Sequence, residues 1–155
     1  MTDTARDMQN LYRELVLDHS RKPRHFGRLE DHTHTADGIN PLCGDKLRLY
    51  LRINNAGEIE SSSFEGTGCA ISVASASLLT DAITGLPADE ALACSSAVTR
   101  RLTSGNQATE LAANLEKLKA LDGVRHYPSR VKCATLAWHA LRSALNNDTA
   151  PATTE

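Results

Sequence analysis

The spacing of hydrophobic residues changes from a helical to a strand pattern near residue 45. Between residues 4 and 20, apolar side chains recur every three or four positions among charged ones, which predicts an amphipathic helix. Residues 47–53 instead alternate between apolar and polar side chains, as in a strand with one buried face. A turn signal at residues 54–57 and a second run at 59–65 predict that this strand belongs to a β-hairpin.

The rest of the chain is predicted to be mainly helical. A glycine-rich break at residues 66–68 precedes a predicted helix at 70–83. A second helical region covers residues 88–120, with an interruption at 103–106, and a last helix covers 131–145. With a short edge strand around residues 33–36, these elements predict an α+β fold, in which an antiparallel sheet of about three strands carries helices on one face.

Domain organisation follows from the length of 155 residues, which favours one domain. We assign residues 1–145 to this domain. Residues 146–155 (NNDTAPATTE) contain no core-forming side chains, so we expect a disordered tail.

Composition excludes several classes of partner. The net charge is −2 and the chain has no basic block, so no electrostatic feature favours nucleic acid or an anionic membrane surface. The sequence contains no apolar run long enough to span a bilayer, and its N-terminus is polar. We therefore expect a cytoplasmic protein.

Four cysteines, Cys43, Cys69, Cys94 and Cys133, are the candidate chemical groups. Disulfides are not expected in the cytosol, and free thiols often pack as small hydrophobic groups. Three of them, however, lie at a predicted loop or helix start, where thiolates are stabilised. With Asp45 they make a Cys3Asp set that suits tetrahedral zinc. Spacing alone leaves a shared metal site and three unrelated thiols equally open.

The residues around these three cysteines resemble the ligand motifs of the IscU/NifU-N iron–sulfur cluster assembly family. The matching segments are residues 40–45 (NPLCGD), 66–72 (GTGCAIS) and 131–134 (VKCA), and residues 17–27 resemble the opening segment of the family. The resemblance extends from about residue 11 to residue 145 and implies a SufE/NifU/IscU-like fold.

Three departures from the housekeeping scaffolds indicate the SufU-type branch. Lys132 stands where those scaffolds carry a histidine. Residues 126–130 (HYPSR) replace the Leu-Pro-Pro-Val-Lys segment that their Hsp70 chaperone binds. Residues 86–121 also make the interval between the second and third motifs longer, as in SufU proteins.

The SufU resemblance implies a zinc site made by Cys43, Asp45, Cys69 and Cys133. It also implies that Cys43 accepts persulfide sulfur from a SufS-type cysteine desulfurase, once a histidine of the desulfurase has replaced it on the zinc. Downstream cluster assembly proteins are further implied partners. Arg130 resembles an arginine near this site, expected to pair with Asp45 or to stabilise thiolate and persulfide charge.

Two alternatives use the same four ligands. They would hold iron or a transient [2Fe–2S] cluster in a scaffold, because cysteine thiolates serve zinc and iron–sulfur clusters alike. In the second alternative, the protein is an interaction module and the zinc has a purely structural role. Cys94 lies outside every motif and is expected to be a packed thiol, and His126 is the histidine to examine because it lies near the Cys133 segment. No phosphate-binding loop or dinucleotide fingerprint indicates a conventional enzyme.

Overall fold

The computed structural model describes residues 2–103 and 113–154, and its centre is a four-stranded sheet. The strand order is β3-β2-β1-β4. The strands are β1 (His34–Asn40), β2 (Asp45–Ile53), β3 (Ile59–Thr67) and β4 (Ala152–Thr153). The β1–β2 and β2–β3 pairs are antiparallel, whereas β4 runs parallel to β1.

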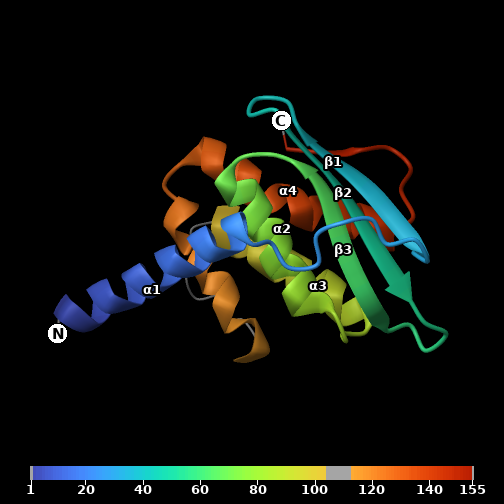
Figure 1. The fold of residues 1–155 in the computed structure, drawn as a ribbon, viewed down its shortest axis with the longest axis horizontal. Coiled ribbons are helices and arrows are strands. Elements are labelled where there is room, and N and C mark those ends of the chain that lie inside the picture. The colour runs from blue at the N-terminus through green and yellow to red at the C-terminus, as the bar shows by residue number, and fades with distance from the viewer. Residues whose placement is uncertain (1, 104–112, 155) are drawn as a thin grey trace.

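Helices cover one face of this sheet (Figure 1). They are α1 (Thr2–Arg21), α2 (Ala70–Ile83), α3 (Ala88–Thr103), the 3₁₀ helix η1 (Ala113–Val124) and α4 (Pro128–Leu145). Both α2 and α4 contribute buried side chains to the core beside the strands, while the N-terminal part of α1 projects away from the body (Figure 1). The predicted α+β architecture with helices on one face is therefore confirmed.

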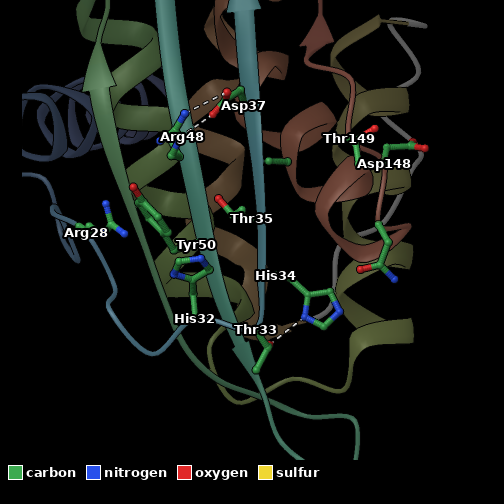
Figure 2. Close-up of a pocket in the computed structure, with 12 residues that line it drawn as sticks. Arg28, His32, Thr33, His34, Thr35, Asp37, Arg48, Tyr50, Asp148 and Thr149 are labelled. Carbon is green, nitrogen blue, oxygen red and sulfur yellow. Dashed lines mark hydrogen bonds and ion pairs between the residues drawn. The ribbon is translucent and has the colours of Figure 1, made fainter.

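The alternating pattern of β2 explains which face is covered. Leu47, Leu49 and Leu51 are buried in the hydrophobic core shared with α2 and α4. Arg48 points to the opposite face, where its guanidinium pairs with Asp37 of β1 at 2.7 Å (Figure 2). The sheet thus has one apolar face against helices and one polar face, as is common for antiparallel sheets.

Trp138 of α4 is the largest side chain in the core and is fully buried. Its indole Nε1–H donates to Ser75 Oγ at 3.1 Å, and Ser75 Oγ donates to the Ala134 carbonyl. These bonds satisfy the polar atoms that burial would otherwise leave without partners. They hold α2 and α4 in a fixed relation to each other.

Several element boundaries differ from the sequence predictions by a few residues. The structure has α2 at the predicted 70–83, but β3 continues to Thr67 and α4 begins earlier, at Pro128. The predicted edge strand is longer and runs from His34 to Asn40. The predicted interruption at 103–106 lies, apart from Thr103, outside the described residues.

The C-terminal segment differs most from the prediction of a disordered tail at 146–155. In the structure Ala152–Thr153 pairs with Gly38 and Ile39 of β1, and Thr154 N–H donates to the Ile39 carbonyl at 3.4 Å. An open strand edge offers backbone hydrogen bonds that need no apolar side chain, so a polar segment can pair there. The domain boundary at residue 145 stays a prediction.

No described helix combines the length and the apolar character needed to cross a membrane.

Among the described glycines, Gly66 of β3 is the one where an added Cβ would meet the closest atom, and replacing it should destabilise the protein. Its φ is +143°, and an added Cβ would lie 2.0 Å from the Lys46 carbonyl oxygen of β2. We expect Gly66→Ala to lower the free energy of unfolding by about 2 kcal/mol or more, because backbone rather than a side chain would have to move. Urea denaturation measures this change.

Gly123→Ala is the matched control, because a Cβ at Gly123 would have no neighbour within 4 Å. This variant should stay within about 0.5 kcal/mol of the wild type. Equal losses in the two variants would contradict the interpretation of Gly66.

Candidate metal centre

Three predicted ligands converge at one end of the sheet. One side-chain donor atom from each of Cys43, Asp45 and Cys133 lies within 4.8 Å of the other two. Cys43 belongs to the turn between β1 and β2, Asp45 is the first residue of β2, and Cys133 lies in the first turns of α4. Residues separated by about ninety positions in the sequence therefore form one potential metal site.

The turn that carries Cys43 is tight. Asn40 and Asp45 are paired across β1 and β2, and Gly44 N–H donates to the Asn40 carbonyl at 2.9 Å. Gly44 has a φ of +73°, a left-handed conformation that favours glycine. The turn therefore places the exposed Cys43 thiol beside the buried Asp45 carboxylate.

Asp45 is fully buried and connects three segments of the site. Its Oδ1 accepts a hydrogen bond from Cys69 N–H at 2.9 Å, and its Oδ2 accepts one from Asn40 Nδ2 at 3.2 Å. A Cβ on Gly68 would lie 2.8 Å from Asp45 Oδ1, so only glycine allows the backbone before α2 to come this close. Asp45 thus ties the start of α2 to the β1–β2 turn.

Cys69 is the N-cap residue of α2, and its Sγ accepts a hydrogen bond from Ser72 N–H at 3.5 Å. Unpaired N–H groups and the helix dipole favour a thiolate at this position. Cys69 does not belong to the group of three close donor atoms, but it lines the same cavity as Cys43 and Cys133. It is therefore available as the fourth ligand.

Cys133 is buried, and Asn40 Nδ2 donates to its Sγ at 3.5 Å. Burial, reinforced by hydrogen bonds with Asp45, Cys43 and Cys69, raises the pKa of the Cys133 thiol well above its usual range. The isolated thiol is therefore protonated at neutral pH, and a bound cation would be needed to stabilise its thiolate.

The donor set fits a metal ion. No lysine or arginine among the described residues forms an ion pair with Asp45, although this carboxylate is fully buried. A buried carboxylate without a cation is unfavourable, and a divalent metal would supply the missing positive charge. Three sulfur donors and one oxygen donor suit zinc, and the thiolates would also suit an iron–sulfur cluster.

Arg130 lies at this cavity, but it does not pair with Asp45, which was one of its two expected roles. It lines the cavity together with the three cysteines. Its guanidinium carbon is 5.0 Å from the centroid of the Tyr127 ring, a cation–π distance, and among the described residues it makes no ion pair with Asp45. The geometry therefore leaves its positive charge near the thiols.

Other residues singled out in the sequence lie elsewhere. Cys94 is buried in the hydrophobic core, where burial raises its pKa to about 11. His126 lines a neighbouring cavity rather than that of the cysteines. Asn40 was not predicted to belong to the site, although its amide contacts two candidate ligands. Its place within the NPLCGD motif is the sequence feature that could have indicated this role.

Comparison with known proteins identifies the family of this chain. The sequence matches the family described as "NifU-like N terminal domain" over residues 11–134. It is 39% identical over 140 residues to the zinc-dependent sulfurtransferase SufU of Bacillus subtilis (strain 168), covering 90% of this chain and 92% of SufU. It is 38% identical to the iron–sulfur cluster assembly scaffold protein IscU of Streptococcus pyogenes serotype M1, covering 89% of this chain and 84% of IscU.

The fold agrees as well. The crystal structure of the N-terminal part of a nitrogen-fixing NifU-like protein from Brucella abortus superposes with a TM-score of 0.80 at 23% identity, covering 91% of this chain and 96% of that one. The family resemblance seen in the cysteine motifs is therefore confirmed over most of the chain. This chain belongs to the NifU-like N-terminal family of iron–sulfur cluster assembly proteins.

Proposed function

We propose that this protein is a zinc-dependent sulfur acceptor that takes persulfide sulfur from a SufS-type cysteine desulfurase on Cys43. One observation carries the proposal. Among the three donor atoms that lie within 4.8 Å of one another, only that of Cys43 belongs to an exposed residue, whereas Asp45 and Cys133 are buried. An exposed thiol beside two buried ligands can reach a partner while the rest of the site stays in place.

Each side chain has a distinct part in this proposal. Zinc, when bound by Cys43, Asp45, Cys69 and Cys133, would keep the cysteines as thiolates at neutral pH. Asn40 orients Asp45 and Cys133 through its amide nitrogen. Cys69 and Cys133 lie at or near helix N-termini, while Cys43 lies in a turn, so Cys43 is the ligand best able to move.

The transfer is a thiol–disulfide exchange. The Cys43 thiolate attacks the outer sulfur of the donor persulfide, a new S–S bond forms on Cys43, and the donor cysteine leaves as a thiolate. The electrons balance without another oxidant or reductant. The cavity of about 680 Å³ beside Cys43 has room for the donor segment, and Arg130 lines it, where its charge would stabilise the attacking thiolate and the persulfide.

A scaffold that assembles a transient [2Fe–2S] cluster is the second candidate function. The similar identities to SufU, at 39%, and to IscU, at 38%, do not separate the two functions. Lys132, in the position where housekeeping scaffolds carry a histidine, favours the zinc-dependent acceptor. A purely structural zinc is disfavoured by the exposure of Cys43, because structural sites are usually closed.

Metal content separates these candidates. Protein purified without oxygen should contain zinc, show no visible absorption and stimulate a SufS-type cysteine desulfurase. Elemental analysis, an absorbance spectrum and sulfide production measure these three properties. Brown protein with iron and labile sulfide, and without stimulation, would instead establish the scaffold.

Cys43→Ala should abolish sulfur acceptance, because the attacking thiolate is lost. In the metal-free protein the free energy of unfolding should change by no more than about 0.5 kcal/mol, because the side chain is exposed. Mass spectrometry of the persulfidated protein and urea denaturation measure the two effects. Cys94→Ala is the control, since it removes a core thiol and should keep full sulfur acceptance. Sulfur acceptance by Cys43→Ala would disprove the role of Cys43, and loss of folding in this variant would favour the structural zinc.

Zinc binding to the metal-free protein should release protons at pH 7. Burial raises the pKa of Cys133, so its thiol carries a proton until the metal binds. The apparent affinity should therefore fall as the pH is lowered and rise as the pH is raised. Calorimetry in two buffers of different ionisation enthalpy counts the protons released, and Cys133→Ala should release fewer. Equal proton release by this variant would contradict the assignment of Cys133.

A further inference from the structure

The three cysteines of the candidate metal centre differ in the hydrogen bonds that their sulfur atoms accept. Cys69 Sγ accepts one from Ser72 N–H at 3.5 Å. Cys133 Sγ accepts one from Asn40 Nδ2, also at 3.5 Å. Among the described residues, no N–H group donates to the sulfur of Cys43. The fold therefore supplies an N–H donor to two of the three sulfur atoms and none to the third.

Both N–H donors are held in place by the fold. Ser72 is fully buried, and its N–H lies in the first turn of α2, where a helix provides no backbone acceptor. Asn40 is fully buried as well, and its backbone carbonyl accepts the hydrogen bond from Gly44 N–H that closes the β1–β2 turn. Neither N–H···S hydrogen bond therefore depends on an exposed or mobile side chain.

A hydrogen bond donated to a thiolate makes the thiolate a weaker nucleophile. The donor stabilises the negative charge on sulfur and so lowers the basicity of the thiolate. Intrinsic nucleophilicity falls with basicity, and a tenfold loss of basicity corresponds to a roughly threefold loss of rate. In a metal-bound site all three cysteines would be thiolates already. This effect, rather than the degree of protonation, would then separate their reactivities.

Exposure alone does not single out Cys43 as the reactive thiol. Cys43 and Cys69 are both exposed and line the same cavity, so a small electrophile can reach either sulfur. What separates these two cysteines is the N–H donor, which Cys69 has and Cys43 lacks. The hydrogen bonds therefore distinguish two thiols that exposure does not.

Asn40 is an unfavourable residue at its position unless its amide nitrogen is needed. Its Oδ1 atom is buried and has no hydrogen-bond partner among the described residues. A leucine, which has nearly the same shape, would avoid the unfavourable burial of an unpaired acceptor. The amide is used only through its nitrogen, which donates to Asp45 and to Cys133.

We propose that the two N–H···S hydrogen bonds select Cys43 as the nucleophile of the site, with Asn40 as the residue that suppresses the reactivity of Cys133. This inference rests on the proposed sulfur-acceptor function, which it deepens by explaining why one thiolate reacts. Asn40 acts through the sulfur atom that it contacts, so it is a positioning residue. The selection is a property of the free, metal-bound protein and can be measured without a desulfurase.

Cadmium substitution tests whether the two hydrogen bonds exist in the metal-bound protein. A spin-active cadmium isotope in the site should show scalar coupling, through the N–H···S hydrogen bonds, to the Ser72 amide proton and to an Asn40 side-chain proton. In Asn40→Leu only the Ser72 coupling should remain. Coupling to an N–H group of the β1–β2 turn, or no coupling to Asn40 in the wild type, would overturn the proposal. The wild-type spectrum decides this point even where the variant fails to fold.

Alkylation of the zinc-loaded protein measures the order of reactivity. With limiting iodoacetamide at neutral pH, Cys43 should react at least about threefold faster than Cys69. Asn40→Leu should raise the alkylation rate of Cys133 about threefold, because the donor is lost while the shape is retained. Peptide mass spectrometry follows each cysteine separately. An unchanged rate for Cys133 in the variant, or equal rates for Cys43 and Cys69 in the wild type, would overturn the proposal.

Ser75→Ala is the matched control for a purely structural effect near Cys133. It removes the hydrogen bonds of Ser75 Oγ with the Ala134 carbonyl and with Trp138 Nε1–H, so it loosens the contact of α2 with α4. It leaves both N–H···S hydrogen bonds in place, so the alkylation rate of Cys133 should not change. A threefold rise in this variant as well as in Asn40→Leu would show easier access to Cys133 and overturn the role of Asn40.

The sulfur-acceptor function and this inference can fail separately. If the wild type accepts no sulfur from a desulfurase but the alkylation order is as expected, the proposed function fails and the selection of Cys43 stands. If the wild type accepts sulfur on Cys43 while Asn40→Leu leaves the alkylation of Cys133 unchanged, the function stands and the role of Asn40 is overturned.

Discussion

The buried carboxylate of Asp45 is the group on which the rest of the site depends. Its two oxygens accept hydrogen bonds from Cys69 N–H and from Asn40 Nδ2, so one side chain joins the N-terminus of α2 to the β1–β2 turn. The same amide of Asn40 reaches Cys133 in α4. Burying a carboxylate is unfavourable unless hydrogen bonds and a cation compensate. The fold thus provides the hydrogen bonds, and a bound metal ion would supply the cation.

This arrangement places the three cysteines in different structural surroundings. Cys133 is buried in a helix that packs through Trp138 against α2, and Cys69 caps α2 itself. Cys43 lies in the turn between β1 and β2, which the hydrogen bond from Gly44 N–H to the Asn40 carbonyl closes, and its side chain is exposed. Cys69 is exposed as well, but as the N-cap of α2 it is held by the helix, whereas Cys43 lies in a turn. This difference in surroundings is what favours Cys43 as the acceptor in the proposed function.

The sequence could predict most of the fold and three candidate ligands that the structure brings together, but not the hydrogen bonds that hold them. The alternation in β2 and the helical spacing of α2 are local patterns, so they were predictable from short windows. The contact of Asn40 with Cys133 and the pairing of β4 with β1 join residues that are far apart in the chain. No short stretch of sequence contains both partners. The tail was expected to be disordered because it is polar, yet its strand uses backbone hydrogen bonds. The convergence of the cysteine motifs likewise joins residues far apart in the sequence, so only the family resemblance predicted it.

The exposure of Cys43 creates a conflict between reactivity and selectivity in the proposed function. A Cys43 thiolate that a donor can reach is also accessible to other electrophiles, and shielding it by burial would exclude the donor as well. Asp45 and Cys133 are buried, so the exposed part of the site is limited to Cys43 and Cys69. In the proposed acceptor, the exposed turn would provide the reactive thiol, while the buried ligands would keep the site intact.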